Sequence, residues 1–225
     1  MTPKILTLIP VKPNLHPRLK RMIHVIADNM ELTNSNMDVV FDESGKGDAH
    51  VVTLEDRVAH TCGIRNNMVK KNLTKDYSHV FWVDADIIGL DPTIPAELLL
   101  KREVGMNAVI APKVMIFDGR GRKRFYDTAG FVTPVGKCLQ PLAPHGYEQY
   151  ASESSSLIEM NGVGCVYMVP ANVYRAGAQH EARPGFTDHL AVCEFAKMQM
   201  GMKVMMDTSR EVFHAWLPHY GEKCH

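Results

Sequence analysis

The feature that most constrains the fold is the alternation of short apolar runs with longer helical segments. The runs KILTLIPVK, MDVVFDES, HVFWVDADI and NAVIAPKV have the length and composition of buried strands. Between them, residues 16–29 and 55–73 carry apolar side chains at the spacing of one helical face, and residues 92–103 open with a proline typical of a first helical turn. This alternation predicts βαβ units, and therefore an α/β fold with a mainly parallel sheet flanked by helices.

The alternation stops after Val114. Residues 117–157 are rich in Gly, Pro, Ser and charged side chains and are too long for a plain connection, so we expect a functional excursion there. Regular structure returns with EMNGVGCVYMVP as a strand, TDHLAVCEFAKMQMG as a helix that Thr187 caps and Gly201 ends, and two short strands, KVMMD and REVFH. We predict a single domain over residues 1–225.

The composition excludes several classes of protein. Lys plus Arg equals Asp plus Glu, at 25 each, so no net charge indicates a polyanionic partner, although a local basic face can coexist with this balance. No apolar run approaches the roughly 18 residues that span a bilayer. The cysteines form no CxxC pair, which favours a reducing compartment. We expect a soluble cytoplasmic protein without a membrane span.

Carboxylates stand where predicted strands end. Asp84 and Asp86 close the third apolar run, and Asp42 closes the second. Ligands of open parallel sheets bind beyond the carboxyl ends of the strands, and alternation along a strand would point Asp84 and Asp86 the same way. Two such oxygens suit a hard divalent cation. The alternative is that these acids cap the next helix or pair with an arginine, because an Asp-x-Asp pattern alone is a weak signal.

An ordered set of segments resembles a known family. RNNMVKKNL before HVFWVDADI, then NAVIAPKV, NGVGCVYMVPANVYRAGA and TDHLAVCEFAKMQMGMKVMMDTSREVFH, is similar to nucleotide-sugar glycosyltransferases of the GT-A fold. The resemblance covers about residues 4–214 and is nearest to glycosyltransferase family 2-like enzymes and fungal mannan-polymerase mannosyltransferases. It implies a Rossmann-like nucleotide-binding half at about 1–116, and an acceptor-side excursion with the catalytic half at about 117–225.

The resemblance also implies a metal site. Asp86 matches the main ligand of the DxD motif, Asp84 matches the group nearer the ribose, and His214 stands where a late-strand histidine often completes the site. The implied cofactor is Mn²⁺ or Mg²⁺, which binds the diphosphate of the donor. An isolated histidine is more often structural, so His214 as a ligand depends on its place in this pattern.

The same resemblance assigns residues to the nucleotide sugar, through the end of the first strand, the second strand, the long helix and the NGVG turn. These nucleotide-sugar positions are Pro10, Asp42, Arg57, Arg65, Asn66, Asp84, Asn161, Gly162 and Gly164. A solvated arginine on a helix face, or a tight turn before a core strand, is the alternative for several of them.

The catalytic position falls at the start of the last predicted helix. There the resemblance makes Asp188 the general base, with His189 in place of the usual second acid. A base opposite the leaving group implies inversion, whereas the mannan-polymerase resemblance implies retention, and we favour inversion. A carboxylate that only caps its helix is the alternative for Asp188.

The expected function is metal-dependent transfer of a sugar from a nucleotide-diphosphate sugar to an acceptor hydroxyl. The acceptor is a glycan, a protein or a hydroxymethylated base in DNA, as in phage-type DNA modification. The basic stretch DGRGRKRFYD is a candidate phosphate contact, although a solvated loop is the commoner explanation. The alternatives are a catalytically degenerate nucleotide-sugar or glycan-binding module, and a nucleotidyltransferase, which would need a Gly-rich loop that IPVKPN lacks.

Overall fold

The computed structural model describes residues 3–12, 15–43, 54–101, 107–117, 119–126, 130–134, 157–183 and 187–215. The helices are α1 (Pro17–Thr33), α2 (Leu54–Asn72), α3 (Ile94–Leu99), α5 (Ala171–Arg175) and α6 (Leu190–Met200). The strands are β1 (Ile5–Pro10), β2 (Met37–Asp42), β3 (His79–Val83), β4 (Ile87–Gly89), β5 (Ala108–Phe117), β6 (Lys123–Phe125), β7 (Leu157–Glu159), β8 (Val166–Pro170) and β9 (Lys203–His214).

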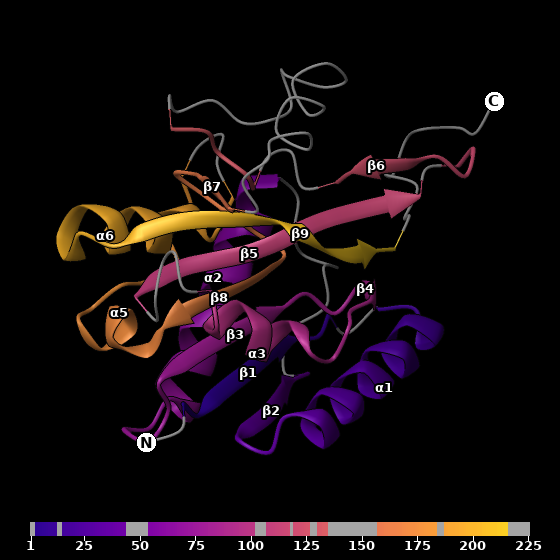
Figure 1. The fold of residues 1–225 in the computed structure, drawn as a ribbon, viewed down its shortest axis with the longest axis horizontal. Helices are drawn as coiled ribbons and strands as arrows, with labels where there is room; N and C mark the ends of the chain where they lie inside the picture. The colour runs from indigo at the N-terminus through magenta and orange to yellow at the C-terminus, as the bar shows by residue number, and fades with distance from the viewer. Residues whose placement is uncertain are drawn as a thin grey trace.

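The described strands form one sheet in the order β2-β1-β3-β8-β5-β9-β4, with β6 paired to β5 and β7 paired to β9 (Figure 1). β1 runs parallel to β2 and to β3, and β5 runs parallel to β9. β8 enters antiparallel between β3 and β5, so the sheet is mixed. The α/β class expected from the sequence is confirmed.

Helices cover the sheet on both faces. In Figure 1, α2 lies behind the sheet and α3 lies in front of it. The residues of α1 that are fully buried, Ile23, Ala27 and Met30, recur every three or four positions, which is why this segment forms a helix with one apolar face. α6 ends at Gly201, which adopts a left-handed conformation with φ of 63°, as the sequence predicts.

The third predicted strand differs from expectation at its end. β3 stops at Val83, and the amide of Ile87 donates to the carbonyl of Asp84 at 3.1 Å, so Asp84, Ala85 and Asp86 form a tight turn before β4. The prediction that strand alternation aligns Asp84 and Asp86 is therefore wrong. The turn, rather than a strand, determines where the two carboxylates point.

The two short strands predicted at the end of the described chain are one long strand, β9. Its pairing with β5 shifts between Pro112–Asp207 and Lys113–Glu211, so β9 carries extra residues there. The Asp207 carboxylate accepts hydrogen bonds from the amide and the hydroxyl of Ser209, which closes this irregularity without ending the strand.

Most of the excursion predicted for residues 117–157 lies outside the described residues. Its described parts are β6, which forms a hairpin with β5, and a short stretch in which Val132 bridges to Gly162. Within the described part of the chain, no helix is long and apolar enough to cross a membrane.

Candidate functional site

A cavity of about 210 Å³ opens where β1 and β3 end, beside α2. Parallel strands end at the same edge of a sheet, which is why two segments distant in sequence meet there. The lining residues are Pro10, Val11, Lys12, Leu15, Arg57, Val58, His60, Thr61, Ile64, Arg65, Asp84, Ala85, Asp86 and Asp188. The lining thus combines an apolar surface with three carboxylates and several cationic groups.

The cavity gathers part of the predicted site. Of the positions expected from the sequence, those in the lining are Pro10, Arg57, Arg65, Asp84, Asp86 and Asp188. Those not in the lining are Asp42, Asn66, Asn161, Gly162, Gly164, His189 and His214. Most of the second set comes from other segments, since Asp42 ends β2, the NGVG residues precede β8 and His214 ends β9. Asn66 and His189 directly follow Arg65 and Asp188 in the sequence, so for these two the direction of the side chain makes the difference.

Arg65 is at the centre of the polar contacts. Its Nη2 donates to Oδ1 of Asp84 at 2.6 Å, and its Nε lies 2.6 Å from Oδ2 of Asp188. One guanidinium therefore joins the turn after β3 to the segment before α6. Two sides of its fork are occupied by carboxylates, so the predicted role of Arg65 in binding a nucleotide would depend on its remaining donors.

Aromatic rings enclose the Arg65 guanidinium. Its central carbon lies 4.8 Å from the ring centroid of Trp82 and 5.9 Å from that of Tyr167. Arg65 is only 2% exposed, and its Nη1 has no hydrogen-bond partner in the described structure. A buried donor without a partner is costly, so a ligand that accepts a hydrogen bond from Nη1 would be stabilised. Nε also lacks a hydrogen bond, although it is ion-paired with Asp188 at 2.6 Å.

Asp188 is held as an anion. Burial opposes its ionisation, but Arg65, together with His189 and His180, outweighs burial and holds the pKa of Asp188 well below its ordinary value. Oδ1 of Asp188 also lies 3.5 Å from Nδ1 of His189. In this arrangement Asp188 is a weak proton acceptor, because an effective general base has a pKa near the working pH.

The backbone before β8 supports Asp84. The amide of Asp84 donates to the carbonyl of Cys165 at 3.0 Å. Cys165 has a φ of 56°, in the left-handed region that non-glycine residues rarely adopt, and the amide of Val166 bonds back to the carbonyl of Gly164 at 2.7 Å. Strained backbone of this kind clusters at functional sites, and the sequence offered no signal for it.

The second carboxylate, Asp86, faces His214. Nε2 of His214 lies 3.0 Å from Oδ1 of Asp86, and Nδ1 lies 2.7 Å from the carbonyl of Ala215. The ring of Tyr126, from the excursion, stacks on the His214 ring at 3.9 Å. Burial disfavours both charges, yet each group stabilises the other, so the pKa of Asp86 is lowered and that of His214 is raised.

The Asp86–His214 pair has the chemistry of a partial metal site. A carbonyl that accepts from Nδ1 leaves Nε2 as the ligating nitrogen, which is the usual arrangement around a metal-bound histidine. Among the described residues, no three His, Cys, Asp or Glu side chains are grouped so as to hold a metal ion. Asp84, whose oxygen is bound to Arg65, does not complete such a group.

A chain of hydrogen bonds within the protein interior connects the indole of Trp82 to the backbone of Asp188. Trp82 Nε1 donates to Tyr174 Oη at 2.7 Å, Tyr174 Oη lies 3.3 Å from His180 Nε2, and His180 Nδ1 lies 3.2 Å from the Asp188 carbonyl. The side-chain amide of Asn66 donates to the carbonyl of His180 and accepts from its amide, both at 2.9 Å. Asn66 therefore binds backbone rather than facing the cavity.

The NGVG turn packs against α6. A Cβ on Gly162 would lie 2.8 Å from Cδ1 of Leu190 and 3.2 Å from the carbonyl of Gly130, so a larger residue there would force the Leu190 side chain to shift. The Asn161 amide accepts from Nζ of Lys197 at 2.7 Å and donates to the carbonyl of Pro134. These contacts support the turn before a core strand that the sequence analysis kept as an alternative.

Several residues of the lining are not among the positions expected from the sequence. His60, Thr61 and Ile64 follow Arg57 on α2 at helical spacing, so the recurrence of one face from Arg57 to Arg65 is a signal that could have found them. Lys12 lies just beyond β1, in the segment IPVK that the resemblance already indicated. His180 carried no motif and could be found only in three dimensions.

Comparisons with known proteins give the fold. No protein-family model and no curated protein matches the chain. Among solved structures, GalNAc-T7 with UDP, GalNAc and Mn²⁺ is similar with a TM-score of 0.55 at 11% identity, over 98% of this chain and 45% of that one. This chain therefore spans less than half the length of the GalNAc-T7 chain.

A second enzyme matches over a larger share of its length. The catalytic domain of Drosophila β1,4-galactosyltransferase 7 with xylobiose gives a TM-score of 0.50 at 11% identity, over 100% of this chain and 77% of that one. A mutant of the same enzyme with manganese, UDP-Gal and xylobiose gives 0.50 at 12% identity. At these identities the similarity concerns the fold, and the chain has the fold of GT-A glycosyltransferases.

Proposed function

We propose that this protein transfers a sugar from a nucleotide-diphosphate sugar to an acceptor hydroxyl. The observation that carries the proposal is the meeting of Asp84, Asp86 and Asp188 at one cavity, at the end of parallel strands. The similar GT-A structures were solved with UDP, UDP-Gal and Mn²⁺, which supports the same class of donor here. The finer similarity to family 2-like and mannan-polymerase enzymes rests on the sequence pattern alone.

Asp86 and His214 are the residues that would hold a Mn²⁺ or Mg²⁺ ion. Their donor atoms, a carboxylate oxygen and an imidazole nitrogen, suit Mn²⁺ in particular. When bound, such an ion stabilises the negative charge that develops on the departing diphosphate. Two protein ligands leave positions for diphosphate oxygens and water, in keeping with the absence of a three-residue group among the described side chains.

The cationic residues of the lining would hold the diphosphate. Lys12 and Arg57 belong to different elements and both border the cavity, so they can contact phosphate oxygens from two sides. Arg65 adds its unpartnered Nη1. The apolar part of the lining, from Leu15, Val58 and Ile64, would contact the nucleoside.

Asp188 is the proposed base on the acceptor side. To take a proton it must first lose the contact with Arg65, because that contact stabilises its charge. A nucleotide-diphosphate sugar that binds Arg65 through phosphate would weaken this pair. Inversion of the anomeric centre follows if Asp188 acts from the face opposite the leaving group.

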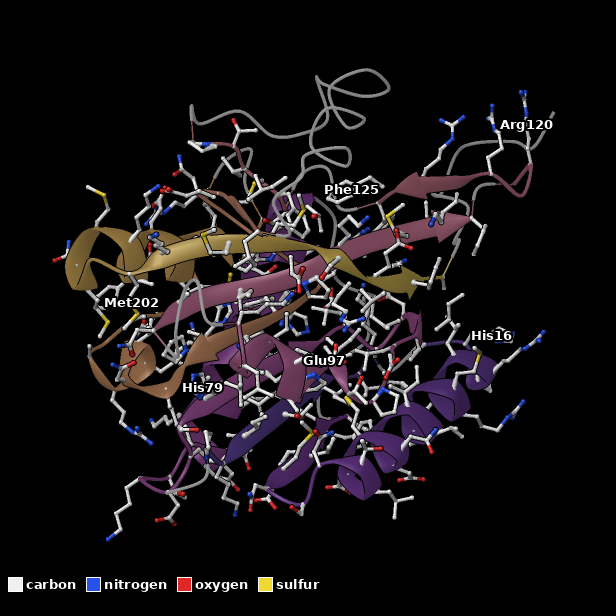
Figure 2. The ribbon with its side chains drawn as sticks, in the orientation of Figure 1. His16, His79, Glu97, Arg120, Phe125 and Met202 are labelled. Atoms are coloured by element: carbon white, nitrogen blue, oxygen red, sulfur yellow. The ribbon has the colours of Figure 1, made fainter. Side chains whose placement is uncertain are left out.

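Two classes of acceptor are proposed, a glycan or protein, and modified DNA. The basic hairpin of β5 and β6 favours the second: Arg120, Arg122 and Arg124 are exposed, and Figure 2 shows Arg120 at its outer end. On the same hairpin, Nζ of Lys123 lies 2.9 Å from Oε2 of Glu211. Binding of duplex DNA that weakens steeply with added salt would support this acceptor.

A nucleotide-sugar or glycan-binding module without turnover is the second candidate function. The specific observation in its favour is the Arg65–Asp188 pair, which ties up the proposed base. A catalytic protein and a nucleotide-sugar-binding module both bind the donor, but only the first releases nucleoside diphosphate.

The test begins with UDP-, GDP-, dTDP- and CDP-sugars, screened for thermal stabilisation with and without MnCl₂. We expect one donor to raise the melting temperature only with the metal, and the wild type to release nucleoside diphosphate from it. Asp188→Asn should reduce turnover far more than donor binding. Stabilisation without release would identify a nucleotide-sugar-binding module, and no stabilisation by any donor would contradict both the transferase and that module.

A further inference from the structure

His180 is held in a single hydrogen-bonding state by its neighbours. The indole of Trp82 can only donate, so the Tyr174 oxygen accepts from it and the Tyr174 hydroxyl is left to donate to Nε2 of His180. The carbonyl of Asp188 can only accept, so Nδ1 of His180 carries the proton. His180 is therefore the neutral Nδ1–H tautomer.

The surroundings of His180 exclude a role as a proton carrier. Its side chain is fully buried, and the edge of Trp82 contacts it with ring centroids 5.3 Å apart. Burial, and then the nearby Arg65, lowers the pKa of His180 to about 3. His180 therefore stays neutral at physiological pH with both ring nitrogens hydrogen-bonded, so any role it has depends on where it holds its neighbours.

Consecutive residues of α2 hold both ends of the segment that runs from His180 to Asp188. Asn66 binds the main chain of His180 in both directions, and Arg65 binds the carboxylate of Asp188. His180 closes the segment through its bond to the Asp188 carbonyl. The place of the Asp188 carboxylate relative to Asp84 is thus determined by α2 and by the His180 side chain.

We propose that His180 is a positioning residue for Asp188: through its Nδ1–H bond to the Asp188 carbonyl, it places the Asp188 carboxylate at the cavity wall. The inference rests on the proposed function, because Asp188 acts there on the acceptor. Loss of the bond displaces the carboxylate and slows turnover, while the donor-binding residues Lys12 and Arg57 are unaffected.

Two substitutions test the contacts of the two ring nitrogens of His180 one at a time. In His180→Asn, the side-chain amide nitrogen can replace Nδ1 and keep the bond to Asp188. In His180→Gln, the amide reaches the place of Nε2 and keeps only the contact with Tyr174. His79→Gln is the matched control, since His79 is also buried but begins β3, at the end of the strand opposite Asp84 (Figure 2).

The kinetic readout is kcat and donor KM for release of nucleoside diphosphate, per folded protein. We expect His180→Gln to lower kcat about 10-fold with donor KM nearly unchanged, because small misplacements of catalytic groups cost rate. We expect His180→Asn to retain most of the kcat, and His79→Gln to retain all of it. If the wild type is active and the two His180 variants have equal kcat, the positioning role is overturned while the proposed function still stands.

A spectroscopic readout needs no activity. ¹⁵N NMR of the histidine rings, with His180 assigned from the signal lost in His180→Asn, should show a protonated Nδ1 and an unprotonated Nε2 that persist into mildly acidic buffer. A His180 ring that protonates like an exposed histidine would overturn the inference, whereas a wild type inactive on every donor would overturn the proposed function and this role with it.

Discussion

Arg65 Nε lies 2.6 Å from the Asp188 carboxylate, although the two residues come from opposite halves of the chain. The same guanidinium binds Asp84 at 2.6 Å. This buried bridge connects the turn that follows β3 with the segment that leads into α6. The bridge holds these two segments together, and it also stabilises the negative charge of Asp188, the proposed base.

The bridge predicts strong coupling between its partners. Arg65→Met should lower the free energy of unfolding by about 3–5 kcal/mol, because it removes a buried cation and leaves the partly buried carboxylates of Asp84 and Asp188 unpaired. Asp188→Asn should also destabilise, but the double variant should lose less than the sum of the two, as measured by urea unfolding. Strictly additive losses would show that the contact contributes no pairwise energy.

Asp86→Ala should remove the metal dependence of donor binding. The substitution deletes the carboxylate that faces His214, so MnCl₂ and donor together should no longer raise the melting temperature. The variant should fold, because Asp86 lies in a turn and is not part of the apolar core.

Asp28→Ala is the control for this substitution, since Asp28 is an exposed carboxylate on α1. It should keep the full metal-dependent shift, and EDTA should abolish that shift in the wild type. A metal-dependent shift of wild-type size in Asp86→Ala would rule out Asp86 as a metal ligand.

Acid should destabilise the protein through His180. The folded-state pKa of His180 is lowered to about 3, so below the ordinary value of about 6.5 the unfolded chain binds a proton that the folded chain does not. The contribution of His180 to the free energy of unfolding is therefore fully present above about pH 6.5 and decreases as the pH falls toward 3.

The size of the pH effect follows from the same linkage. Between pH 7 and pH 5, this group should cost the wild type about 2 kcal/mol of unfolding free energy, at about 1.4 kcal/mol per pH unit. His180→Asn should lack this component, so the pH dependence of the two proteins should differ by that amount in urea unfolding. Parallel curves would mean that His180 titrates normally in the folded state.

Two glycine substitutions should have opposite effects. Gly162→Ala places a Cβ 2.8 Å from Leu190 and should cost about 1–3 kcal/mol through overpacking. Gly63→Ala, in α2, meets nothing within 4 Å and should stabilise by about 0.5–1 kcal/mol, because alanine favours the helix. Thermal unfolding of both variants measures the contrast, and a harmless Gly162→Ala would refute the close packing of the NGVG turn on α6.

The sequence predicted the elements whose signal is local. α1, α2 and β1 formed where apolar spacing placed them, and Gly201 ended α6, because periodic burial and a left-handed glycine leave a mark in a short window. The boundary after Val83 was missed because Ala85 and Ile87 alternate with Asp84 and Asp86 as residues of a strand do, and the turn depends on a hydrogen bond that composition does not reveal.

The site was predictable only in part. Asp84 and Asp86 could be selected because paired acids after a buried strand are conspicuous in the sequence, and both line the cavity. Asn66 and Arg65 are adjacent in sequence and could not be told apart there. In the structure, Asn66 binds the His180 backbone while Arg65 binds two carboxylates.

The sequence by itself determined the α/β class and the presence of carboxylates where strands end, because periodicity and residue type are local properties. The tertiary structure decided which charges meet. Asp188 joins Arg65, Asp86 joins His214, and His180 becomes neutral, because ion pairing and desolvation depend on distances between segments that only the folded sheet brings together.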